Sequence, residues 1–104
     1  MEATSSNGCA SMVIGVLQVQ LGIPGADSLK AKRMVVLSLK DRIRKNFNVS
    51  VAEVDDNDQW TSATLAIVMV SNDRRFSNRV LSKIVNLIES AHDLTLDDYQ
   101  LGFV

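Results

Sequence analysis

The strongest constraint in this sequence is the order in which two kinds of hydrophobic pattern follow one another. Runs rich in β-branched residues, which are typical of strands, occupy 12–21, 48–54 and 60–70, and a short run ends the chain at 99–104. Segments whose apolar residues recur every three or four positions, as in amphipathic helices, follow the first and third runs. The predicted order is therefore strand, helix, strand, strand, helix, strand.

Short polar residues mark where each helix should begin. Asp27 or Ser28 offers an N-cap for the first helix, and Ser71-Asn72-Asp73 offers one for the second. The apolar stripe predicted for the first helix consists of Leu29, Val36, Leu39, Ile43 and Phe47. The stripe predicted for the second consists of Phe76, Val80, Ile84, Leu87, Ile88 and Ala91.

This order of elements predicts an α+β fold. Two strand–helix–strand halves joined by a hairpin, with right-handed crossovers, build a ferredoxin-like βαββαβ sandwich. Its four-stranded antiparallel sheet carries both helices on one face. At 104 residues the chain is long enough for one such domain, which we expect over 12–104. Residues 1–11 are small and polar without periodicity, and we expect a flexible tail there.

The opposite face of the sheet should be open, yet its residues are unusually apolar. A half-solvated strand normally alternates apolar with polar residues, and the first and third runs do not do so cleanly. Large exposed apolar patches are uncommon on soluble monomers, so something should cover this face. We expect a homodimer whose interface includes Ile14, Val16, Ala66 and Val68. An apolar ligand or another protein is the alternative.

Charge is distributed unevenly along the chain, although the formal net charge is only −1. All eleven Lys and Arg residues fall on the two predicted helices, together with only three acids, Asp41, Asp73 and Glu89. The helical segments therefore carry +8 and the rest of the chain −9. The candidate anion-binding or nucleic-acid-binding residues are Lys30, Lys32, Arg33, Lys40 and Arg44 on the first helix and Arg75, Arg79 and Lys83 on the second.

Basic stripes of this spacing suit a phosphate backbone, because each Lys or Arg that neutralises a phosphate releases counterions. The alternative is that these side chains only keep the helix surface soluble. Lys32 lies on the apolar stripe of its helix, and we expect its stem to cross the core while its ammonium reaches water. Alternatively, Lys30, Lys32 and Arg33 bind an anion at the helix N-terminus.

Several stretches together resemble a known bacterial family. They include Ser28-Leu29-Lys30-Ala31-Lys32-Arg33, Asn48-Val49-Ser50-Val51-Ala52-Glu53-Val54 and Asp58-Gln59-Trp60. The chain from Met12 to about Val104 is similar to the YlxP-like family, a domain of unknown function. The resemblance implies a ferredoxin-like fold and no catalytic residues. Genes of this family tend to lie near those for translation-initiation and ribosome-maturation factors, which implies association with RNA or the ribosome.

The sequence offers little for catalysis, metal binding or a cofactor, and we expect none of them. His92 is the one histidine, expected at the end of the second helix, and Cys9 is the one cysteine, so a typical zinc site is excluded. The acids around Asp55 lack the spacing of an EF-hand and suit a solvated turn. Gly22-Ile-Pro-Gly25 matches the GxxG loop of KH domains only weakly. Neither central strand carries the aromatic residues on which an RNA-recognition motif stacks bases.

The chain has no signal sequence and no apolar run long enough for a membrane span, which predicts a cytoplasmic protein. Our leading hypothesis is a non-enzymatic protein that binds RNA or a ribosomal particle through a basic helix face. The alternative is a structural or adaptor protein that uses its apolar sheet face.

Overall fold

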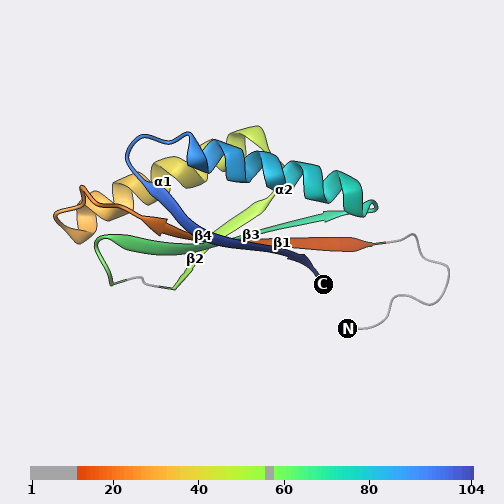
Figure 1. Ribbon diagram of the computed structural model, residues 1–104, viewed down its shortest axis with the longest axis horizontal. Coiled ribbons are helices and arrows are strands. Elements are labelled where there is room, and N and C mark those ends of the chain that lie inside the picture. Colours follow the sequence, from red (N-terminus) through yellow and green to blue (C-terminus); the bar gives the residue numbers. More distant parts are fainter. Residues whose placement is uncertain (1–11, 56–57) are drawn as a thin grey trace.

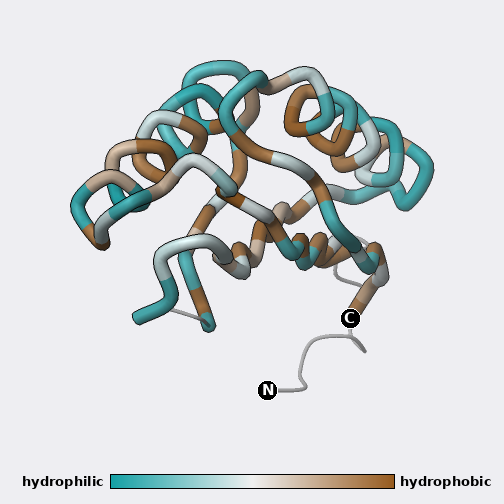
Figure 2. Tube along the Cα trace, turned by 60° about the vertical axis from the view of Figure 1, so that its left-hand side comes forward, coloured by the Kyte–Doolittle hydropathy of each residue, from teal (hydrophilic) through white to brown (hydrophobic). Residues whose placement is uncertain are grey.

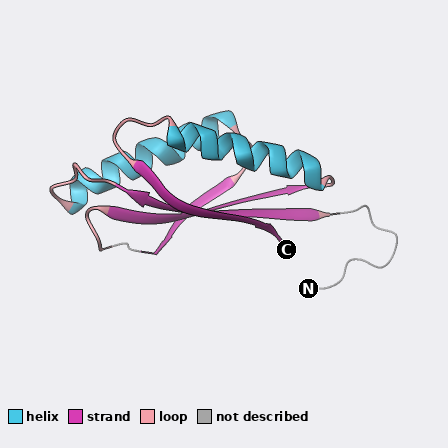
Figure 3. Ribbon diagram, viewed as in Figure 1, coloured by secondary structure: helices cyan, strands magenta, loops and turns pink. Residues whose placement is uncertain are grey.

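The computed structural model describes residues 12–55 and 58–104, so the tail expected over 1–11 lies outside the described residues. The elements follow the predicted order: β1 (Val13–Gly22), α1 (Leu29–Asn46), β2 (Ser50–Asp55), β3 (Ser62–Ser71), α2 (Arg74–Glu89) and β4 (Thr95–Phe103). The strands form one sheet in the order β2-β3-β1-β4, with every neighbouring pair antiparallel. Both helices cover the same face of this sheet (Figures 1 and 3). The ferredoxin-like α+β fold is thus confirmed.

Each helix begins at a residue that caps it. The hydroxyl of Ser28 accepts a hydrogen bond from the backbone N–H of Ala31 at 3.0 Å, so Ser28 and not Asp27 is the N-cap of α1. The carboxylate of Asp73 accepts from the N–H of Arg75 at 2.9 Å and caps α2. Both caps satisfy backbone donors that a helix leaves without a partner in its first turn.

The core lies between the helices and the sheet. Alternate residues of β1 and β3 are buried on the side of the helices. The hydrophilic parts of both helices lie mostly on the side away from the sheet (Figure 2). The buried apolar side chains from the central strands and helices include Leu17, Val19, Leu21, Leu65, Ile67, Val36, Leu39, Ile43, Leu81, Ile84 and Ile88. A Cβ added at Gly15 would lie only 2.9 Å from Cδ1 of Leu81, so the glycine allows α2 to pack closely on β1.

Some predicted boundaries were wrong. β4 begins at Thr95, four residues before the predicted start, and β3 begins at Ser62 rather than Trp60. The first half of β4 carries exposed Asp97 and Asp98, and it pairs with β1 through a register shift between Gln20 and Leu21. An acidic edge strand that contains a bulge lacks the regular alternation of apolar and polar residues from which a strand is predicted.

Candidate nucleic-acid interface

All eleven basic side chains lie within the bounds of α1 and α2, so the prediction that no strand carries one is confirmed. They are distributed over surfaces of very different character. One group lies on the flank of α1 beside the edge strand β2, and another lies on the exposed side of α2.

The flank of α1 beside β2 uses part of its charge to hold the fold together. The guanidinium of Arg44 donates a hydrogen bond to the backbone carbonyl of Val51 in β2 at 2.9 Å. The ammonium of Lys32 lies 3.0 Å from Oε2 of Glu53, also in β2. The side chain of Lys32 is only 1% exposed. This contact is an ion pair rather than a well-aligned hydrogen bond, because Oε2 of Glu53 has no partner of good hydrogen-bond geometry.

The prediction that the ammonium of Lys32 reaches water was therefore wrong. Its side chain points between helix and sheet because a carboxylate is available there, and burying a charge is tolerable when it is paired. The signal for this pair is present in the sequence. Val51 and Glu53 share one face of β2, and Val51 is buried, so Glu53 is an acid on the core-facing side of a strand. Lys32 is a base on the core-facing stripe of a helix.

The remaining candidates on α1 stay at the surface. Lys30 and Arg33 are exposed and Lys40 is half-buried, while Leu37 between them is 55% exposed. Lys32 is turned inward, so the structure does not place Lys30, Lys32 and Arg33 together around the N-terminus of α1. Only part of the predicted stripe is therefore available to a ligand.

The row on α2 is different, because all three predicted members are exposed. Arg75, Arg79 and Lys83 follow one another at successive turns on the outer side of the helix. None of them forms an ion pair with another residue of the parts 12–55 and 58–104. This row presents positive charge to solvent.

Aromatic rings lie beside the start of this row. The guanidinium carbon of Arg79 lies 5.8 Å from the ring centre of Phe76, and that of Arg74 lies 4.5 Å from the ring centre of Phe103 in β4. Phe76 is 45% exposed. Its prediction as a core residue was wrong, because Ser77 takes the buried position instead and shares a hydrogen bond of 2.5 Å with the hydroxyl of Ser71. Ala91 likewise lies beyond the end of α2.

The register of the sheet places most of the acidic loop residues at the end of the sheet remote from the start of α2. α2 starts directly after β3, and α1 leads to Ser50, which pairs with Val68 near that same end of β3. At the other end, Gly22 pairs with Thr95, and the N–H of Ile23 donates to Thr61. The acids of that end are Asp27, Asp55, Asp58, Asp93, Asp97 and Asp98. The start of α2 is thus remote from most of the acidic side chains.

The four residues predicted for a dimer interface do share one face. Ile14 and Val16 of β1 pair with Val70 and Val68 of β3, and Ala66 pairs with Gln18. The buried core residues of β1 and β3 have odd numbers, whereas these four have even numbers. Because successive side chains of a strand point to opposite faces, the four lie on the face without helices. No aromatic residue of β1 or β3 lies on this face, which agrees with the expectation drawn against base stacking on the sheet.

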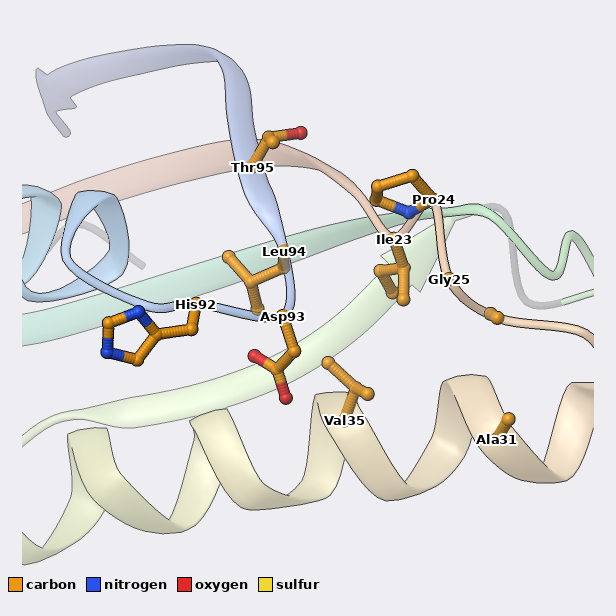
Figure 4. Close-up of a pocket in the computed structure, with 10 residues that line it drawn as sticks. Ile23, Pro24, Gly25, Ala31, Val35, His92, Asp93, Leu94 and Thr95 are labelled. Atoms are coloured by element: carbon orange, nitrogen blue, oxygen red, sulfur yellow. The ribbon is translucent and has the colours of Figure 1, made fainter.

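A hollow of about 320 Å³ lies between the β1–α1 loop, the start of α1 and the α2–β4 loop (Figure 4). Its lining is mainly apolar, and Asp93 extends toward Val35 of α1 within it. His92 also lines it, three residues beyond the end of α2 rather than at the helix end as predicted. Neither Lys30 nor Lys32 contributes to the lining, so this hollow and the basic surfaces are separate features.

The comparisons with known proteins identify the family. Residues 14–101 match the family described as "Protein of unknown function (DUF503)". The chain belongs to the DUF503 family. It is 32% identical over 78 residues to the "Uncharacterized protein YlxP" of Bacillus subtilis (strain 168), an alignment that covers 75% of this chain and 85% of that protein. The predicted resemblance to the YlxP-like DUF503 family is confirmed. No helix in the described part of the chain is long and apolar enough to span a membrane.

Proposed function

We propose that the protein binds RNA, free or within a ribosomal particle, through the first turns of α2. The observation that carries the proposal is the exposed row of Arg75, Arg79 and Lys83, which forms no ion pair within the described residues and lies beside Phe76. Lys and Arg at successive helical turns can contact successive phosphates. Unpaired bases of RNA stack on aromatic rings and guanidinium planes.

The placement of two arginines supports the proposal further. Arg74 and Arg75 occupy the first turn of α2, which contains no acidic residue. A positive charge at a helix N-terminus opposes the helix dipole, and each such charge costs about 0.3–1 kcal/mol of stability. Arg74 recovers part of this cost through its contact with Phe103, but no comparable contact offsets the cost of the exposed Arg75 among the described residues. Binding to an anion therefore explains Arg75 better than solubility does, since positions later in the helix would serve solubility without that cost.

The experiment measures binding to single-stranded RNA of about 16 nucleotides, a length that spans typical single-strand sites. The variant replaces Arg75, Arg79 and Lys83 by Glu. Its matched control makes the same change in charge on α1 at Lys30, Arg33 and Lys40. We expect the α2 variant to lose detectable binding and the α1 control to lose less than tenfold. Equal losses in both would overturn the assignment to α2.

The salt dependence provides an independent measurement on the unmodified protein. With about three phosphates contacted, the logarithm of the association constant should fall against the logarithm of salt concentration with a slope of about −2. Binding that does not change between low and high salt, or no binding to RNA at low salt, would refute the proposal.

A further inference from the structure

The face of the sheet that carries no helix is divided into an apolar half and a polar half. The apolar half, near the C-terminal end of β3, includes Ile14, Val16, Ala66, Val68 and Val70, with Gly102 of β4 beside Val16. The polar half includes Gln18, Gln20, Asp98 and Gln100, while Thr64 between them is buried. Val70 is 64% exposed, and Ile14, Val16, Ala66 and Val68 are half-buried. An apolar surface of this kind, bordered by amides, is typical of a protein contact.

We infer that this face binds a second copy of the same chain. Charge favours that occupant, because all the Lys and Arg residues lie on the helical layer, on the other side of the sheet. The apolar half carries no charged side chain among the described residues. Two copies can therefore approach face to face without repulsion across the centre of the contact, whereas a highly charged partner would find nothing there to pair with.

The area of the face is also suitable. β1 and β3 each have ten residues, and the sheet has four strands. At about 3.3 Å per residue and 4.8 Å per strand, the face measures about 33 by 19 Å, or 600 Å² before side-chain relief is counted. Stable interfaces bury about 800 Å² per partner. The apolar half alone is too small, so the amides of Gln18 and Gln100 belong to the contact as its polar rim.

Only one simple arrangement of two protomers overlaps their whole sheet faces and also brings the two apolar halves together. A twofold axis that runs parallel to β1 and β3, midway between them, lays β1 of one protomer over β3 of its partner. Val16 then faces Val68, and β4 of one protomer faces β2 of the other, so that Ala52 lies opposite Gln100. A twofold axis perpendicular to the strands would instead place β2 over β2. Sheets packed in this way lie about 10 Å apart.

Sedimentation velocity over a range of protein concentrations tests whether the dimer exists. We expect the unmodified chain to be dimeric at micromolar concentration and Val68→Asp to be monomeric. Val70→Asp, at a more exposed position, provides a second variant that a folded monomer tolerates. Leu37→Asp, an exposed apolar residue of α1, is the matched control and should remain dimeric. A monomeric unmodified chain at tens of micromolar, or dimeric Val68→Asp and Val70→Asp variants, would overturn the inference.

Cross-linking tests the arrangement. In a chain with Cys9→Ser, one preparation carries Ala52→Cys and another carries Gln100→Cys. A thiol reagent that spans about 10 Å should cross-link the mixture. It should fail with either preparation alone, because like residues would lie three strand spacings, about 14 Å, apart laterally as well as 10 Å across the interface. Efficient cross-linking of Ala52→Cys to itself would refute this axis. Because the contact is apolar, added salt should not dissociate it, which separates this result from the RNA measurement.

Discussion

The ammonium of Lys32 lies 3.0 Å from the carboxylate of Glu53, with the lysine side chain 1% exposed and the glutamate side chain 21% exposed. This ion pair joins the first turn of α1 to the edge strand β2. It also shows that two basic residues only one position apart, Lys32 and Arg33, have opposite roles, since one is inside the fold and the other is on its surface. Counting positive charges along α1 therefore overstates what a ligand can reach.

Glu53→Gln should lower the free energy of unfolding by about 2–3 kcal/mol, because it removes the negative charge that lies 3.0 Å from the buried ammonium of Lys32. The loss should be smaller than for a fully enclosed pair because Glu53 is partly exposed. Lys32→Met should cost about 1 kcal/mol, and the double variant should recover most of the stability. Chemical denaturation of the four proteins measures the coupling. Additive losses would show that the pair contributes nothing as a pair, and Arg33→Met is the surface control.

Asp73→Asn should strengthen RNA binding about twofold to fivefold while lowering stability by less than about 1 kcal/mol, since Asn caps helices nearly as well as Asp. The change keeps an acceptor for the N–H of Arg75 and removes the negative charge closest to Arg74 and Arg75 in sequence. Asp73→Ala removes the cap as well and should cost about 1 kcal/mol more. Affinity measured at low salt and thermal unfolding distinguish the two effects. Weaker binding by Asp73→Asn would contradict the proposed position of the RNA.

Phe76→Ala should weaken binding to single-stranded RNA by about 1–3 kcal/mol, the range for loss of one stacked base. Its effect on stability should be modest, because the ring is 45% exposed. Phe76→Tyr keeps a stacking surface and should bind normally. Leu37→Ala removes an exposed apolar side chain of α1 and serves as the control. If Phe76→Ala binds RNA as well as the unmodified chain, stacking on this ring is ruled out.

The order and type of all the elements could be predicted from the sequence, because hydrophobic periodicity and short capping residues mark them. The start of β4 could not. Thr95 to Asp98 is held in the sheet by its pairing with β1. The segment itself, Thr-Leu-Asp-Asp, shows no alternation of apolar and polar residues that would predict a strand. Backbone pairing across a bulge depends on a strand that is distant in sequence, which a local pattern does not record.

Side-chain positions near helix starts were the other difficulty. Phe76 and Ser77 differ by one position, and the more hydrophobic of the two was predicted to be buried. The structure buries Ser77 because its small side chain suits the close approach of α2 to Gly15 and its hydroxyl pairs with that of Ser71. The placement of Lys32 similarly depended on a partner in another element. Helix periodicity predicts which residues face the core to within about one position. Which of two neighbouring residues is then buried depends on the side chains that other elements place against it.

The contact between Arg44 and Val51 has a consequence for how copies of this chain meet. β2 is an edge strand, and edge strands with unpaired carbonyl groups invite the addition of strands from other molecules. The guanidinium occupies one such carbonyl, the strand has only six residues, and a register shift interrupts it between Glu53 and Asp55. The opposite edge, β4, carries Asp97 and Asp98. Both borders of the sheet thus discourage the open-ended addition of strands that leads to fibrils.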